Sequence, residues 1–183
     1  IYSDDYIKII KDSYQKYLDA DLIIFNIPSS NEERSGSKIS SSDCKVGYLK
    51  SLKVASYTIS FKRNSIINNG IKFDELFGAG SVFNSGEENI FLYDCLKKKL
   101  KIYYIPIEIA KVTHETSTWF YGFDKQYFIT KGAFARRMFK RAYFIFIIQF
   151  ALRKYRRYKE NISFFKCISY MYEGQKKYKN YYK

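Results

Sequence analysis

Three short apolar stretches, separated by polar and helix-forming segments, restrict the fold more than any other feature of the sequence. The stretches 20–27 ("ADLIIFNI"), 54–61 ("VASYTISF") and 101–110 ("KIYYIPIEIA") have the length and the β-forming residues that are typical of strands. Pro106 lies inside the third stretch. It predicts a sheet edge or a bulge, because proline has no amide proton to donate to a neighbouring strand.

Helical spacing occupies segments between these strands. Residues 6–18 and 86–99 predict helices, and residues 62–70 predict one or two helical turns that end at Gly70. Two polar stretches, 28–45 and 71–81, predict loops. The order helix, strand, loop, strand, helix, strand indicates an α/β domain with a small sheet.

The charge is concentrated in the last third of the chain. Residues 1–124 contain 16 Lys+Arg and 16 Asp+Glu, whereas residues 125–183 contain 16 Lys+Arg and 2 Asp+Glu, which accounts for the whole net charge of +14. This excess favours a polyanionic partner. We therefore predict an α/β domain over residues 1–123 and a basic, aromatic, helical tail over residues 124–183.

An apolar run from Ala142 to Leu152 forms the centre of this tail. It is shorter than the roughly 20 apolar residues that span a bilayer. One interpretation is a helix in the interface of an anionic membrane, and the other is a core helix with solvated arginines. An apolar run suits lipid better than nucleic acid, so we expect no nucleic-acid partner. The expected membrane contacts are Arg136, Arg137, Arg141, Arg153, Arg156 and Arg157.

Two further features concern the end of the chain and its thiols. The Tyr- and Lys-rich residues 170–183 predict a frayed, solvated terminus. Cys44, Cys95 and Cys167 are far apart and have no metal-binding spacing, which predicts reduced thiols in a cytoplasmic protein. A tail that binds lipid would place such a protein peripherally at the inner face of the cell membrane.

Two consecutive acids, Glu87 and Glu88, open the helix predicted over residues 86–99. Ser85 and Glu88 have the spacing of a capping box, and acidic residues are favoured at a helix N-terminus, so a purely structural role is one interpretation. The same carboxylates follow the glycine-rich stretch 77–86 ("FGAGSVFNSG"), and a carboxylate delivered in this way can act as a catalytic base. The local sequence leaves both interpretations open.

Residues 59–119 contain a series of motifs in a particular order: 63–66 ("RNSI"), 70–78 ("GIKFDELFG"), 86–88 ("GEE"), 101–106 ("KIYYIP") and 114–118 ("HETST"). In order and spacing they resemble the C-terminal half of bacterial family 2 glycosyltransferases, and the similarity covers roughly residues 1–140. The resemblance implies an incomplete GT-A fold, which is a Rossmann-like sheet, with a helical C-terminal extension.

The resemblance also implies an activity. Family 2 enzymes transfer a sugar, often with inversion, from a nucleotide-sugar donor to a hydroxyl of a glycan or lipid-linked acceptor in cell-surface polysaccharide synthesis. Glu88 falls at the position of the general base, where Asp is usual, and Glu87 falls at a position that contacts the acceptor.

Further roles follow from the same resemblance. Residues 2–7 ("YSDDYI") resemble the family element that holds Mg²⁺ or Mn²⁺ on the donor diphosphate. Its last carboxylate falls on Asp4 and its first on Tyr2, which is not a carboxylate, and another register uses Asp4 with Asp5. His114 corresponds to a family position near the metal, and Trp119 is a candidate for stacking on a sugar. The alternative interpretations are purely structural: the two aspartates start a helix, the histidine is a solvated loop residue, and the tryptophan serves only for packing.

The uridine-binding strand of the family has no counterpart in the sequence. We therefore expect the chain to be a fragment whose N-terminal part is missing, and to bind nucleotide poorly and turn over little by itself. The alternative function is a non-enzymatic module that binds a membrane surface or another polyanion through residues 125–183.

Overall fold

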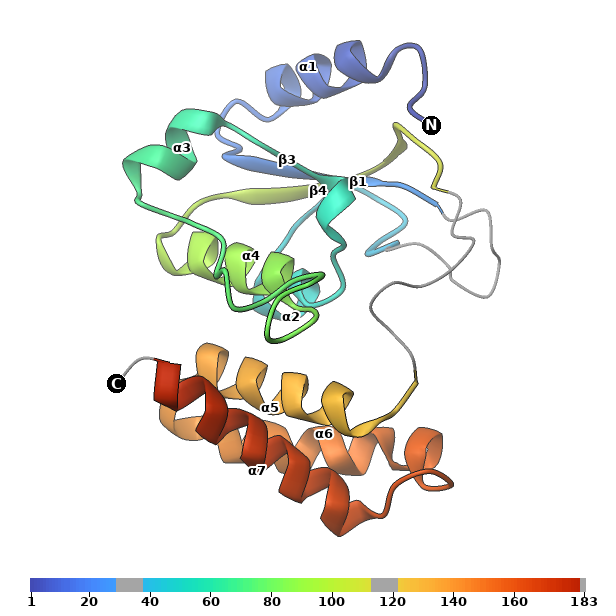
Figure 1. The fold of residues 1–183 in the computed structure, drawn as a ribbon. Helices are drawn as coiled ribbons and strands as arrows, with labels where there is room; N and C mark the ends of the chain where they lie inside the picture. The colour runs from blue at the N-terminus through green and yellow to red at the C-terminus, as the bar shows by residue number, and fades with distance from the viewer. Residues whose placement is uncertain (29–37, 113–121, 182–183) are drawn as a thin grey trace. The chain divides into compact units, whose positions relative to one another are not determined.

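The computed structural model describes residues 1–28, 38–112 and 122–181 (Figure 1). The elements in chain order are α1 (Tyr6–Lys16), β1 (Leu22–Asn26), β2 (Cys44–Lys45), α2 (Tyr48–Ser51), η2 (Ser56–Thr58), β3 (Ile59–Phe61), α3 (Arg63–Asn68), α4 (Glu87–Lys97), β4 (Ile102–Glu108), α5 (Lys125–Phe139), η3 (Lys140–Ala142), α6 (Tyr143–Tyr158) and α7 (Phe164–Tyr181). The protein is therefore of the mixed α/β class, as the sequence predicts.

The chain forms two compact units. The sheet unit comprises Ile1–Phe73 and Phe91–Thr116, and the helical unit comprises Asp74–Ile90 and Ser117–Lys183. The first turn of α4, which carries Glu87 and Glu88, belongs to the helical unit, whereas the sequence placed these residues within a domain that ends at residue 123.

The sheet has four strands in the order β2-β4-β1-β3. The inner strands β1 and β4 are parallel, and the outer strands β2 and β3 are antiparallel to their neighbours. Of the two alternatives predicted at Pro106, an edge or a bulge, the bulge is confirmed: Phe25 pairs with Ile105 and Asn26 with Glu108, so the register shifts around Pro106. Because β2 pairs only with Tyr103 and Tyr104 of β4, the missing amide proton of Pro106 leaves that pairing intact.

Helices cover both faces of this sheet. Leu22 and Ile24 of β1 pack into one apolar cluster with α4 residues that include Leu92, whereas Ile23 and Phe25 pack into a second cluster against α1. Figure 1 shows α1 and α4 on opposite sides of the sheet. Since successive side chains of a strand point to opposite faces, a strand covered on both sides is apolar at successive positions, which explains the unbroken apolar run 22–25.

The shorter elements differ in part from the sequence predictions. The helix predicted to end at Gly70 is confirmed: Gly70 has a φ of +63°, and the amide of Ile71 donates to the carbonyl of Ile66 at 3.1 Å. The strand predicted over 54–61 is too long. Only Ile59–Phe61 forms β3, and the Thr58 hydroxyl donates to the carbonyl of Ala55 at 2.7 Å within the preceding turn η2.

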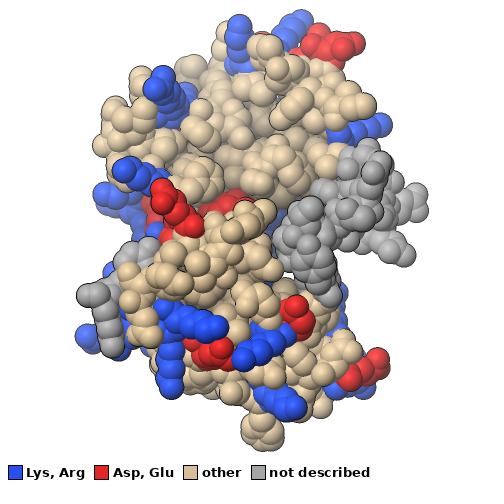
Figure 2. All heavy atoms as spheres, viewed as in Figure 1, with Lys and Arg blue, Asp and Glu red and all other residues tan. Residues whose placement is uncertain are grey.

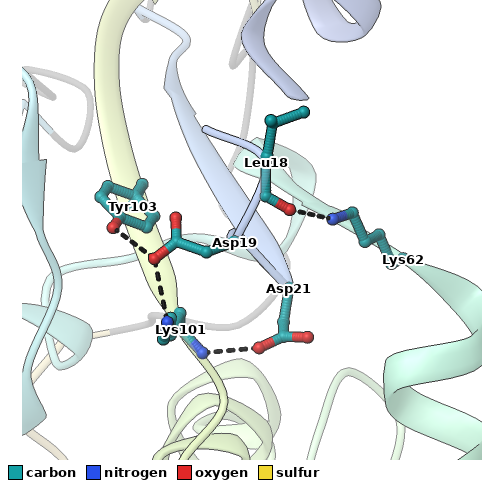
Figure 3. A network of polar contacts seen from close by, with 6 residues as sticks. All are labelled: Leu18, Asp19, Asp21, Lys62, Lys101 and Tyr103. Carbon is teal, nitrogen blue, oxygen red and sulfur yellow. Dashed lines mark hydrogen bonds and ion pairs between the residues drawn. The ribbon is translucent and has the colours of Figure 1, made fainter. Parts of the chain in front are cut away.

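A polar network holds the amino-terminal ends of β1 and β4 together (Figure 3). The Lys101 ammonium lies 3.0 Å from a carboxylate oxygen of Asp19, and the Lys101 amide donates to Asp21 at 2.8 Å. The Lys62 ammonium, at the start of α3, donates to the carbonyl of Leu18 at 2.9 Å. The network joins the turn before β1 to β4 and α3, so its role is structural.

In the helical unit, α5, α6 and α7 pack around a buried aromatic core. Helices α5 and α7 meet at two glycines. A Cβ on Gly132 would overlap the backbone carbonyl of Met171, and a Cβ on Gly174 would overlap that of Ile129. The two backbones therefore come too close for any other residue at these positions.

The end of the chain is more ordered than the sequence predicts. Helix α7 continues to Tyr181 and buries Met171, Gln175 and Tyr178, so the expectation of a frayed terminus over 170–183 is wrong for the part of it that the structure describes, up to residue 181. Helix α6 buries Ile147 and Phe150 and is in part the expected core helix. No helix within the described ranges has the length and hydropathy needed to cross a membrane.

Candidate functional site

A loop that is closed by two backbone hydrogen bonds precedes the acidic start of α4. The Gly78 amide donates to the carbonyl of Phe83 at 2.9 Å, and the Phe83 amide donates to that of Leu76 at 2.9 Å. Gly86 has a φ of +107°, and a Cβ there would come within 2.9 Å of the Phe134 ring. Helix α4 begins one residue later than a Ser85 cap would require, so Gly86 and not Ser85 precedes its first residue.

Ion-pair and hydrogen-bond contacts fix this loop on α5 and α7. The buried carboxylate of Asp74 accepts from Arg137 Nε at 2.8 Å and from the Tyr178 hydroxyl at 3.2 Å. The Thr130 hydroxyl donates to the side-chain oxygen of Asn84 at 3.0 Å. A buried carboxylate needs such partners, since an unpaired charge would be costly. The loop therefore has a defined position within the helical unit.

Glu87 and Glu88 lie side by side where this loop enters α4, and both side chains are half-buried. Glu87 lies against Gly78, where an added Cβ would come within 3.4 Å of its carboxyl carbon. Among the described residues, the buried oxygen Oε2 of Glu87 has no hydrogen-bond partner. A buried carboxylate oxygen without a partner is unusual in a purely structural site.

The surroundings of Glu88 change its protonation. Burial raises the pKa of Glu88 to about 7, the negative charge of Glu87 also raises it, and Lys131 of α5 opposes the increase. Burial lowers the pKa of Lys131, while the charge of Glu88 opposes that decrease. Glu87, Glu88 and Lys131 thus interact electrostatically with one another, and we name these three residues the carboxylate cluster. A carboxyl group with a pKa near neutrality can accept or release a proton under physiological conditions.

Lys131 was not predicted from the sequence. It lies in the stretch "FITKGAF" on α5, where the neighbouring residues Phe128, Ile129, Ala133 and Phe134 are buried. A single lysine within an otherwise apolar part of a helix is a signal that a charged partner is packed nearby. The sequence alone does not identify that partner, because α4 and α5 are separated by a strand and a long connection.

Asp4 and Asp5 lie exposed in the turn before α1. The preceding residues pair with the segment after β4: the Ser3 amide donates to the carbonyl of Ile109 at 2.9 Å. The Val112 amide in turn donates to the carbonyl of Pro28, after β1, at 3.1 Å. The two aspartates therefore follow a segment that lies along the carboxyl ends of the parallel strands, where open α/β sheets commonly bind ligands.

The structure describes only some of the other residues predicted near the metal and the sugar. His114 and Trp119 lie outside the described residues. Tyr2 forms an isolated bridge with Ala110. Within residues 1–28, 38–112 and 122–181, no group of three or more His, Cys, Asp or Glu side chains is arranged to hold a metal ion.

The six arginines predicted to contact a membrane divide into two groups. Arg137 pairs with Asp74, and Arg136 donates to the carbonyl of Lys140 at 3.0 Å and lies over the Tyr143 ring. These two act within the helical unit. The remaining four are exposed on or next to α6: Arg141, Arg153, Arg156 and Arg157.

Sequence comparison does not assign the chain to a family. No protein-family model matches the sequence, and no curated protein matches it at a significant level. The resemblance to family 2 glycosyltransferases therefore depends on the sequence motifs alone.

Proposed function

We propose that this protein takes part in glycosyl transfer, with Glu88 as the general base, and that its sheet unit is part of a GT-A fold. The observation that carries the proposal is the half-buried pair Glu87 and Glu88 beside Lys131, at a helix start that a glycine-rich loop delivers. This is the position at which the resemblance to family 2 glycosyltransferases expects the base.

A structural role accounts less well for the carboxylate cluster. A helix N-terminus is stabilised by exposed acidic residues, which keep their hydration. Burying two adjacent carboxylates with one ammonium costs stability, and Glu87 Oε2 has no hydrogen-bond partner among the described residues. Groups whose pKa is displaced by burial and by a like charge are typical of catalytic sites.

The proposed reaction uses the Glu88 carboxylate as a proton acceptor. Glu88 takes the proton of the acceptor hydroxyl as the hydroxyl oxygen bonds to the anomeric carbon of the donor sugar. The bond from that carbon to the diphosphate oxygen breaks, and the nucleoside diphosphate leaves with the electron pair. Attack opposite to the leaving group inverts the anomeric centre. Lys131 keeps part of the Glu88 population ionised and therefore able to accept the proton.

In this proposal, residues of the sheet unit would bind the donor sugar nucleotide. Asp4, with Asp5 or with His114, would hold Mg²⁺ or Mn²⁺, which prefer oxygen ligands and would neutralise the charge of the departing diphosphate. Two exposed adjacent carboxylates supply suitable donor atoms. They do not form a complete set of ligands within the described part of the chain, so no step is derived through the ion. Trp119 remains a candidate for contact with the sugar.

The experiment measures release of nucleoside diphosphate from UDP- and GDP-sugars by the encoded protein at full length. The mixture contains Mg²⁺ or Mn²⁺ and glycan or lipid-linked acceptors. Loss of a general base should lower the rate of Glu88→Gln by about 100-fold or more. Glu75→Gln, which changes an exposed acid of the same loop, should keep the wild-type rate. Undiminished turnover by Glu88→Gln, or no release by the wild type with any donor, would refute the proposal.

The pH dependence of the rate provides a second test, because replacing a purely structural residue would not shift it. Because the charge of Lys131 lowers the pKa of Glu88, Lys131→Gln should shift the acidic limb of the pH–rate profile to higher pH. An unchanged midpoint would show that Lys131 does not act on the base.

A further inference from the structure

Helix α6 presents an apolar face to solvent. One side of the helix is buried and includes Ile147, Phe150 and Tyr158. On the other side, Ile145 is 59% exposed and Leu152 is 62% exposed. Three further large side chains are exposed with them: Phe144, Ile148 and Tyr155. Single exposed apolar residues are ordinary, but several on one helix face indicate an interaction surface.

The spacing of these residues defines a stripe with basic ends. Ile145, Ile148, Leu152 and Tyr155 follow one another at intervals of three, four and three residues, which places them on one side of α6. Exposed Arg141 lies in the turn η3 just before α6, and exposed Lys159 directly follows its last residue, so a basic residue flanks each end of the stripe. Helix α6 itself carries four further basic residues and no acidic residue: Arg153, Lys154, Arg156 and Arg157.

The opposite charge is present elsewhere on the helical unit. In the view of Figure 2, with α7 toward the viewer, acidic side chains lie among the basic ones over this unit. On α7, Glu173 pairs with Lys177 and with Lys125 of α5. The basic character of the helical unit is therefore least compensated along α6.

We propose that the stripe from Arg141 to Lys159 docks the protein on the surface of an anionic phospholipid bilayer, with α6 lying parallel to the membrane plane. The apolar side chains would enter the boundary between headgroups and acyl chains, while the basic residues contact anionic headgroups. Arg136 and Arg137 have no part in this contact, because they are engaged within the helical unit. The inference does not depend on the proposed glycosyl transfer.

Charge favours a bilayer over a second copy of the chain. Pairing two copies of α6 along their stripes would bring the basic ends together in either direction, Arg141 against Arg141 or Arg141 against Lys159. Residues 141–160 carry six basic residues against one acidic residue, Glu160, which leaves most of the repulsion uncompensated. Nucleic acid also fits less well, since an apolar centre leaves phosphates without partners. An anionic bilayer satisfies both the apolar centre and the basic ends.

The test measures binding to vesicles of phosphatidylcholine with phosphatidylglycerol, and to vesicles of phosphatidylcholine alone, by flotation. The protein should bind the anionic vesicles, and less so at high salt. Ile145→Ser with Leu152→Ser should weaken binding about 30-fold, since two apolar side chains that would be partly buried in the bilayer are lost. Arg141→Gln with Lys159→Gln should weaken it by a similar factor of about 30.

Matched controls lie in the sheet unit. Leu49→Ser with Ile67→Ser removes two apolar residues that are at least as exposed on average, and Lys8→Gln with Lys72→Gln removes the same charge, so both pairs should bind as the wild type does. Absence of vesicle binding, or equal losses in the controls, would overturn the proposal. So would a concentration-dependent dimer in solution that the stripe substitutions abolish without affecting flotation.

Discussion

The substitution Glu88→Gln should stabilise the folded protein at alkaline pH while it removes the proposed activity. Glu88 has a pKa of about 7 in the folded state, against 4.5 for an ordinary glutamate, chiefly because it is buried and secondly because Glu87 is negative. A buried charge of this kind opposes folding. Glutamine has nearly the same shape and carries no charge, so it should relieve that cost.

The sign and the size follow from the pKa difference. Below about pH 4.5 both states of Glu88 hold their proton, and the group contributes nothing. As the pH rises, the unfolded state releases its proton first, so the free energy of unfolding falls, and the fall is complete above the folded pKa of about 7. A shift from 4.5 to about 7 corresponds to about 3 kcal/mol, at roughly 1.4 kcal/mol per unit.

The assay is urea unfolding followed by circular dichroism at about pH 4.5 and about pH 8. Glu88→Gln should match the wild type at the lower pH and exceed it by up to about 3 kcal/mol at the higher pH. The control Glu75→Gln, an exposed acid, should change little at either pH. An equal free energy for Glu88→Gln and the wild type at about pH 8 would refute the view that Glu88 is ionised at a cost in the folded state.

Three other predictions concern packing and reactivity. Gly132→Ala should destabilise the helical unit by about 3 kcal/mol in urea, because its Cβ would overlap the Met171 carbonyl; a fully stable variant would contradict this. Asp74→Asn should cost about 3 kcal/mol, since it leaves Arg137 without its carboxylate partner; a loss no larger than for an exposed aspartate would show that the pair is unimportant. A thiol reagent should label half-buried Cys44 faster than the two buried cysteines in the native state, by mass spectrometry.

Elements with a strong local signal could be predicted from the sequence. The run "LIIF" (22–25) is apolar at successive positions because helices cover both faces of β1, and Gly70 ends α3 because a left-handed conformation is needed there. The start of α4 was also predicted within one residue. In each case the residues that determine the structure are adjacent in the sequence.

Predictions failed where distant contacts decide the outcome. Strand β2 consists only of Cys44 and Lys45, and it forms because β4 offers an open edge, which no local pattern indicates. Helix α7 continues to Tyr181 because Tyr178 reaches Asp74, more than a hundred residues earlier in the chain. Sequence pattern alone predicted a frayed end, since it contains no information on that contact.

The site shows the same division between local and distant information. Two adjacent acids after a glycine-rich loop are visible in the sequence, and they suffice to suggest Glu87 and Glu88 as candidates. Their burial and their coupling to Lys131 are not visible, because the lysine comes from a helix more than forty residues later. Burial, which depends on tertiary packing, is the main cause that raises the pKa of Glu88 to about 7; the adjacent charge of Glu87 adds to it and Lys131 opposes it.

The helical unit treats its buried acid, Asp74, and its half-buried pair, Glu87 and Glu88, differently, and this contrast is the strongest reason to propose that the pair is functional. Asp74 has an arginine at 2.8 Å and a tyrosine hydroxyl at 3.2 Å, which is how a protein normally stabilises a buried carboxylate. Glu87 and Glu88 instead share the influence of one half-buried lysine. A fold that pairs Asp74 so fully has the means to neutralise a structural acid. Leaving Glu88 poised between its charged and neutral forms costs stability, and the proton transfer that we propose would make use of that poised carboxyl group.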